Sequence, residues 1–152
     1  VRAVLGSDAF AASRGARVKR PLRFVVSALR ALEADTHARR PLLVALERLG
    51  QPLFQHPTPD GYPDEAAPWM GTLLWRWTFA GALVRGEVGG VRVDHQALAA
   101  MFGGSPSLER AGAYLLGRAL TSPELRALEP AWAEDRRLGL ALLLASPAFQ
   151  RH

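Results

Sequence analysis

Five prolines of this chain stand at the starts of apolar segments, and their placement constrains the fold more than any other feature. Proline fits the first turn of a helix, where its missing N–H leaves no hydrogen bond unmade, but it is costly in the helix interior. Pro21, Pro41, Pro68, Pro106 and Pro123 each open a stretch with leucine, valine or alanine at helical spacing. The sequence therefore predicts separate helices that begin at prolines, and an all-α fold.

The predicted helices follow one another with short connections. We expect a short apolar stretch over residues 1–12 and helices over residues 21–32, 41–49, 68–85, 94–102, 105–120, 122–130 and 132–145. Asp94 is a suitable N-cap, and Val91-Arg92-Val93 is a short extended piece. The prediction is a compact bundle of seven or eight helices with no convincing sheet, forming one domain over residues 1–152.

Residues 51–64 interrupt the helical pattern with four prolines and the turn pair Asp60-Gly61. We expect one long, ordered, proline-rich loop, held in place by Leu53, Phe54 and Tyr62. Polar chemistry is concentrated here, in His56, Asp60 and Asp64. Because their spacing matches no zinc or calcium motif, we predict neither a metal site nor a cofactor.

Arg76 interrupts the most apolar segment of the chain, between Trp75 and Trp77. A helix that is apolar on nearly all faces is usually buried. A buried guanidinium needs a carboxylate or several carbonyl partners, so we expect Arg76 to reach the surface or to pair with an acid such as Asp64. The alternative is a ligand site beneath the proline-rich loop. Its candidate residues are Arg76, Asp60, Asp64, His56, Tyr62 and Trp69.

The net charge of +5 is concentrated near the start of the chain. Residues 1–32 hold seven basic side chains and one acidic side chain, whereas residues 33–152 hold twelve basic and thirteen acidic ones. Such a patch can attract phosphate, anionic lipid or an acidic partner. Its candidate anion-binding residues are Arg14, Arg17, Lys19, Arg20 and Arg23. Nucleic acid is an unlikely partner, since aromatic interleaving and zinc-finger, RNP or helix-turn-helix motifs are absent.

Several functional classes are limited by what the sequence lacks. It contains no cysteine, which excludes a disulfide scaffold and a thiol nucleophile. No apolar run reaches the roughly 18 residues needed to span a membrane. The spacing supports no Ser-His-Asp set and no pair of catalytic carboxylates, so the sequence leaves open whether the protein is an enzyme.

One short phrase recurs along the chain. Leu144-Ala145-Ser146-Pro147-Ala148-Phe149 is similar to residues 5–10, and residues 120–125 form a looser third copy. Each copy predicts a serine N-cap followed, three residues later, by an apolar anchor in the core. We therefore interpret Ser7, Ser122 and Ser146 as structural residues.

An ordered set of motifs resembles a known family. The motifs are Lys19-Arg20-Pro21, residues 24–30, Leu49-Gly50-Gln51-Pro52-Leu53-Phe54, residues 57–64, Trp69, Leu73-Leu74-x-Arg76 and residues 142–150. Together they resemble the C-terminal part of the bacterial family catalogued as domain of unknown function 1800, over most of the chain. Thr78 departs from the family, which commonly has asparagine there.

The resemblance implies a mostly helical protein without an established activity. Members of the family are several times longer, and this sequence starts at Val1 within a helix-like stretch. We therefore expect the chain to be a C-terminal fragment whose first partner is the remainder of its own longer chain. The resemblance also implies a periplasmic or extracellular location and a sulfatase-like protein, encoded nearby, as a partner.

Three functions are open at this point. The first is a helical interaction or assembly module of an exported bacterial protein. The second is part of an enzyme or ligand-binding site, formed by the proline-rich loop and Arg76 together with N-terminal sequence that is missing here. The third is binding of anionic surfaces or nucleic acid by the basic patch.

Overall fold

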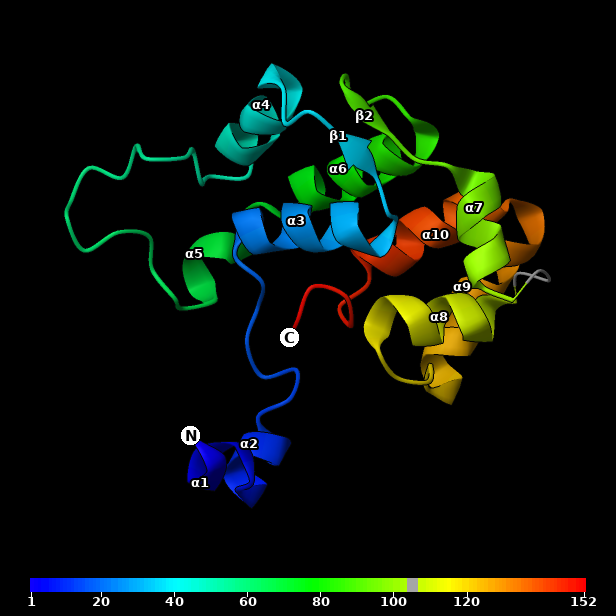
Figure 1. Cartoon of the computed structure of the whole chain (residues 1–152), viewed down its shortest axis with the longest axis horizontal. Coiled ribbons are helices and arrows are strands. Elements are labelled where there is room, and N and C mark those ends of the chain that lie inside the picture. The colour runs from blue at the N-terminus through cyan, green and yellow to red at the C-terminus, as the bar shows by residue number, and fades with distance from the viewer. Residues whose placement is uncertain (104–106) are drawn as a thin grey trace.

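The computed structural model describes residues 1–103 and 107–152 and is mostly helical (Figure 1), which confirms the predicted fold class. The described residues form one small sheet and ten helices, where seven or eight helices were predicted. The helices are α1 (Arg2–Leu5), α2 (Asp8–Ala12), α3 (Pro21–Ala31), α4 (Arg40–Arg48), α5 (Ala67–Met70), α6 (Leu73–Arg85), α7 (His95–Met101), α8 (Leu108–Leu116), α9 (Ser122–Glu134) and α10 (Arg136–Ala145).

The core lies where α3, α6 and α10 meet. Residues at helical spacing bury one face of each helix: Phe24, Val25 and Ala28 on α3, Phe79, Ala80, Leu83 and Val84 on α6, and Leu140, Leu143 and Leu144 on α10. The Phe24 ring packs edge-on against Phe79 and Phe149, with centroids 6.0 and 6.2 Å away. Helix α6 lies along α10, which also packs against α8 and α9.

Several predicted helix boundaries are wrong. The helix expected to reach residue 120 ends at Leu116, before Gly117 with φ of 63°. The helix expected over residues 68–85 is interrupted at Gly71 and Thr72, which separate α5 from α6. Helix α9 continues through Pro130, where it was expected to stop. The break comes at Asp135, whose extended backbone ends α9 and whose carboxylate accepts a hydrogen bond from the Arg137 amide at the start of α10. The helix start expected at Ser105-Pro106 lies outside the described residues.

One small antiparallel sheet of two residues per strand accompanies the helices, and its second strand lies in the extended piece predicted at Val91-Arg92-Val93. Strand β1 (Asp35–Thr36) pairs with β2 (Val91–Arg92), with Asp35 opposite Arg92. A separate bridge joins Val18 to Arg151 and brings residues 17–19 beside residues 150–152. The end of the chain thereby lies against the segment that leads into α3 (Figure 1).

The recurring serine phrase has different outcomes in its three copies. Ser7 and Ser146 accept the predicted hydrogen bonds from Phe10 and Phe149. Phe149 is buried, but Phe10 is half-exposed because α1 and α2 extend away from the body of the protein (Figure 1). In the third copy the helix is capped by Thr121 and not by Ser122. The anchoring prediction therefore fails for Phe10.

Residues 51–66 contain no helix or strand and project outward from the body of the protein (Figure 1). Leu53 packs against the core, and the Tyr62 hydroxyl donates to the Pro52 carbonyl at 2.6 Å. Phe54 does not anchor this segment, because its side chain is fully exposed on a backbone with φ of 59°. Among the described residues, no helix is long and apolar enough to cross a membrane.

Candidate functional site

Arg76 is completely buried and does not meet Asp64. Its Nη1 donates to Oε1 of Gln150 at 2.8 Å, while Nε and Nη2 have no hydrogen-bond partner among the residues that the structure describes. The guanidinium lies 5.3 Å from the centre of the Phe24 ring, and burial lowers the pKa of Arg76 to about 10. The expectation that Arg76 reaches the surface or pairs with Asp64 is therefore wrong. The Gln150 amide is held by its own bond from Nε2 to the Leu144 carbonyl.

Asp64 joins the proline-rich loop to the basic patch. Its two carboxylate oxygens lie 3.1 Å from Nη2 of Arg17 and 3.4 Å from Nη1 of Arg20. Arg20 also donates to the Tyr62 carbonyl at 3.2 Å. The proline-rich loop and the basic patch, which the sequence analysis predicted as separate candidate sites, are thus in contact, and their opposite charges partly cancel.

The other loop candidates make mainly local contacts. His56 lies 4.7 Å from the Tyr62 ring, centre to centre, and its Nδ1 is within hydrogen-bond distance of Thr58. Trp69 is buried, and its indole N–H donates to the Pro63 carbonyl. Asp60 is exposed at the outer turn. The hydrogen bond of the Arg76 side chain goes to Gln150 and to none of these residues. No group of three acidic or histidine side chains suited to a metal occurs in residues 1–103 and 107–152.

Lys19 and Arg23 of the basic patch point toward the end of the chain. The Lys19 ammonium lies 3.8 Å from the centre of the Phe149 ring, and burial lowers its pKa to about 8. Arg23 Nη1 is 2.6 Å from Nε2 of His152. Because arginine can only donate, this Nε2 must accept and the His152 proton resides on Nδ1. Burial and the charges of Arg23, Lys19 and Arg17 lower the pKa of His152.

A second group of basic side chains lines a pocket at the junction of three segments. The pocket has a volume of about 340 Å³ and is formed by Arg14, Gly15, Leu116, Arg118, Ala148, Arg151 and His152, which we call the basic pocket. Gly15 and Gly117 turn the chain there with positive φ angles. Sequence analysis identified only Arg14 of this group, since no local spacing links it to Arg118 or Arg151.

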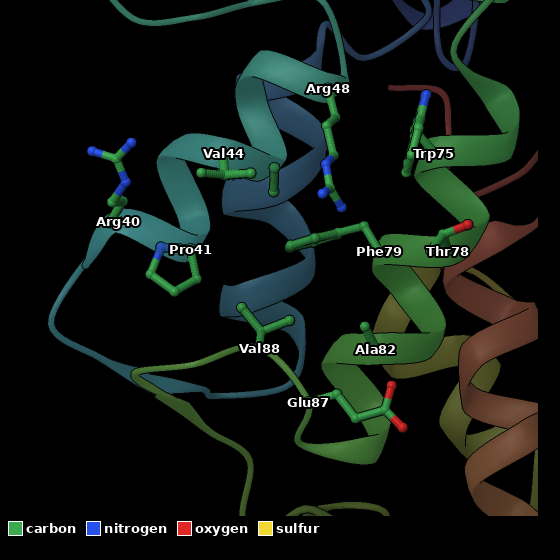
Figure 2. Close-up of a pocket in the computed structure, with 11 residues that line it drawn as sticks. Arg40, Pro41, Val44, Arg48, Trp75, Thr78, Phe79, Ala82, Glu87 and Val88 are labelled. Carbon is green, nitrogen blue, oxygen red and sulfur yellow. The ribbon is translucent and has the colours of Figure 1, made fainter.

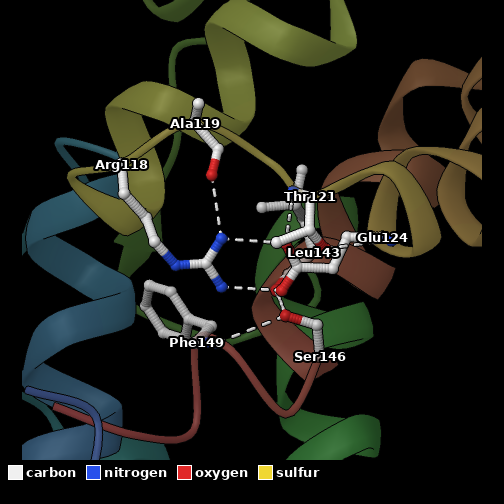
Figure 3. Close-up of polar contacts among 7 residues, drawn as sticks. All are labelled: Arg118, Ala119, Thr121, Glu124, Leu143, Ser146 and Phe149. Carbon is white, nitrogen blue, oxygen red and sulfur yellow. Dashed lines mark hydrogen bonds and ion pairs between the residues drawn. The ribbon is translucent and has the colours of Figure 1, made fainter.

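The wall of the basic pocket is fixed by a polar network around Arg118 (Figure 3). Arg118 binds the Glu124 carboxylate through two bonds of 2.8 and 2.7 Å and also donates to the Ala119 carbonyl. Glu124 accepts in turn from the Thr121 amide, which completes a capping box at the start of α9. The pair with Arg118 is the largest cause that lowers the Glu124 pKa, to about 2.

An apolar groove lies between α4 and α6 (Figure 2). Its volume is about 410 Å³, and its lining residues are Arg40, Pro41, Val44, Ala45, Arg48, Trp75, Thr78, Phe79, Ala82, Glu87 and Val88. The Arg48 guanidinium lies 5.1 Å from the Trp75 ring. Trp75 and the neighbouring Leu74 and Trp77 are exposed, so the prediction that α6 is buried on all sides is wrong.

A comparison with known families gives one result. A family model described as "Protein of unknown function (DUF1800)" matches residues 1–151, which confirms the resemblance found in the sequence. No curated protein and no solved structure matches the chain.

Proposed function

The chain belongs to the DUF1800 family, and we propose that it is a protein-interaction module that binds a partner in the groove between α4 and α6. The observation that carries this proposal is the apolar surface left open there. Val44, Phe79 and Val88 line the groove, and Trp75 is 41% exposed at its edge. Grooves between helices that combine aromatic and aliphatic walls are a recurrent way to bind a partner helix or peptide.

The charges around the groove define the partner's chemistry. Arg48 projects between α4 and α6, and Arg40 stands at the other end of α4 (Figure 2). Neither arginine makes an ion pair within the part of the chain that the structure describes. Glu87, the acid of this lining, is already paired with Arg85 through two bonds of 2.7 and 2.8 Å. The groove therefore suits an apolar anchor flanked by aspartate or glutamate.

Phe54 supplies a second apolar contact point. A fully exposed aromatic ring on a projecting segment gains burial only when another molecule covers it. Export, and a sulfatase-like protein as the partner, remain proposals that the family resemblance motivates. The protein encoded nearby is therefore the first in which we would look for an acidic segment with an apolar anchor.

A peptide-display selection against the full chain tests this proposal. We expect selected peptides to carry a large apolar residue next to Asp or Glu. Their affinity for the Val44→Asp variant should be at least tenfold lower than their affinity for the original chain. Leu43→Asp is the matched control, because Leu43 is exposed on the same helix but does not line the groove.

Charge reversal provides the second arm of this experiment. Arg48→Glu is expected to lower the affinity for acidic peptides and to raise the affinity for basic ones. Arg30→Glu on α3 is the control and should leave both affinities unchanged. Selection of peptides whose binding survives both Val44→Asp and Arg48→Glu would place the interaction elsewhere and refute the proposal for this groove.

A further inference from the structure

We propose that the basic pocket binds a phosphate group or another tetrahedral oxyanion carried by a small molecule. This site is separate from the groove between α4 and α6. It is built from the segment before α3, the connection between α8 and α9, and the end of the chain. Three guanidinium groups from these segments, far apart in sequence, line one concave surface.

The lining of the basic pocket contains no acidic side chain. Of its seven residues, Arg14, Arg118 and Arg151 are cationic, and His152 carries a polar ring. Among residues 1–103 and 107–152, Arg118 alone of these arginines has an ion-pair partner, Glu124, which is not part of the lining. Besides burial, the nearby charges of Arg23 and Lys19 lower the pKa of His152, and these two side chains add positive charge near the pocket. The unneutralised charges of Arg14 and Arg151 converge in this pocket and produce a positive potential, which an anion relieves.

The arginines keep donors available for a ligand. A guanidinium has five N–H donors. Arg14 uses Nη2 for the Gly117 carbonyl at 2.8 Å, and Arg151 uses Nη1 for two long bonds, of 3.4 and 3.5 Å, to the carbonyls of Gly15 and Ala16. The short bond orients the Arg14 side chain before a ligand arrives, whereas the long bonds of Arg151 leave its guanidinium free to turn toward a ligand. Planar guanidinium forks match phosphate oxygens in pairs, which makes arginine the usual phosphate ligand.

The size of the pocket points to a small molecule. Its volume of about 340 Å³ falls at the lower end of the roughly 300–1,000 Å³ that is typical of small-molecule sites. A phosphate group against Arg14 and Arg151 would leave space for an attached organic part beside Leu116 and Ala148. Both of these residues belong to the same lining.

Titration of the full chain with inorganic phosphate tests the site. Binding is measured by calorimetry, and by the rise in the unfolding midpoint that a native-state ligand causes, with ionic strength held constant by sodium chloride. We expect phosphate to bind and to raise the midpoint above chloride alone. Arg151→Gln should weaken binding about tenfold or more, because a hydrogen bond to a charged group is lost.

Arg126→Gln is the matched control. It removes the same charge from an exposed position on α9 that does not line the pocket, and it should leave phosphate affinity within about twofold of the original, because an exposed charge without direct contact to the ligand contributes little. Arg14→Gln is the second test variant, with circular dichroism to verify folding. Arg151→Gln remains informative even if Arg14→Gln fails to fold, because its backbone bonds are long.

Vesicles of phosphatidylglycerol and of phosphatidylcholine distinguish the two sources of phosphate. If the protein co-sediments with the anionic vesicles and free phosphate abolishes this co-sedimentation, the proposal is supported with a lipid headgroup as the ligand. Phosphate binding without co-sedimentation supports a soluble ligand. The proposal is overturned if phosphate acts no differently from chloride, or if Arg151→Gln and Arg126→Gln bind phosphate equally well.

Discussion

Arg76 and Gln150, 74 residues apart in the chain, are joined by a buried hydrogen bond of 2.8 Å from Nη1 to Oε1. The bond connects α6 to the turn after α10. Gln150 is the one hydrogen-bond partner that the Arg76 side chain has among the described residues. A charged group held by a single neutral amide is costly to bury, so the structure depends strongly on that amide.

Removing the amide is expected to cost more than removing the charge. Gln150→Leu leaves Arg76 buried without a partner and should lower the free energy of unfolding by about 3 kcal/mol or more. Arg76→Met removes the charge and leaves the neutral Oε1 of Gln150 unpaired, which should lower the free energy of unfolding by about 1–3 kcal/mol. The double variant should lose less than the sum of the two single changes. Urea unfolding of all four proteins measures this, and simple additivity would contradict the predicted coupling.

Lys19 should make stability depend on pH in the alkaline range. Its pKa is lowered from 10.5 to about 8 by burial, so between these values the unfolded chain binds more protons than the folded one. Stability therefore rises as the pH increases from about 8 to 10.5. In the Lys19→Met variant this rise, on the order of 2 kcal/mol, should be absent. A rise of the same size in both proteins would show that other groups cause it.

Glu124 should make the free energy of unfolding depend on pH in the acidic range. Its pKa is lowered from 4.5 to about 2, chiefly by Arg118, so its contribution is fully present above pH 4.5 and is lost as the pH falls toward 2. Glu124→Gln is expected to destabilise the protein by about 1–2 kcal/mol at pH 7 and to match the original protein near pH 2. Thr121→Ala removes the hydroxyl cap but leaves the Arg118–Glu124 pair, and it should cost about 1 kcal/mol at pH 7.

Gly139 should not tolerate alanine, although alanine normally favours a helix by about 1 kcal/mol. A Cβ at this position of α10 would come within 2.9 Å of the Trp132 Cα and 2.6 Å of its ring. Backbone cannot yield easily, so we expect Gly139→Ala to cost about 1–3 kcal/mol. Gly71→Ala is the control, because its φ is −66° and no atom lies within 4 Å of the added Cβ. Equal unfolding midpoints for the two variants would contradict this account.

Local sequence signals predicted the helices whose ends depend on their own residues. Pro21 and Asp94 stand at the first turn and the N-cap that the sequence indicates, and the Asp94 carboxylate accepts from the Gln96 and Ala97 amides. Pro130 was misinterpreted as a stop. Helix α9 has a complete capping box and packs against α8 and α10, so tertiary packing outweighs one lost backbone bond.

The candidate sites depend on contacts between distant residues, and local patterns carry no information about those. Nothing near Arg76 indicates that its partner is Gln150, and an amide has no charge that would suggest the pairing. Arg118 and Arg151 are isolated arginines in the sequence, yet they line one pocket. The groove was missed for another reason: the apolar composition of α6 indicates burial, and only the packed arrangement shows which face stays open.

The pairing of residues 17–19 with residues 150–152 has a consequence for how the protein is made. A ribosome adds roughly 5–20 residues per second, so Arg76 is synthesised about 4–15 s before Gln150, 74 residues later, emerges. Throughout that interval Arg76 lacks its amide, Phe24 lacks Phe149 and the backbone of Lys19 lacks the Gln150 carbonyl. The core therefore cannot close before residue 150 has been made, and until then a chaperone could cover the face of α6 that packs against α10 in the folded protein.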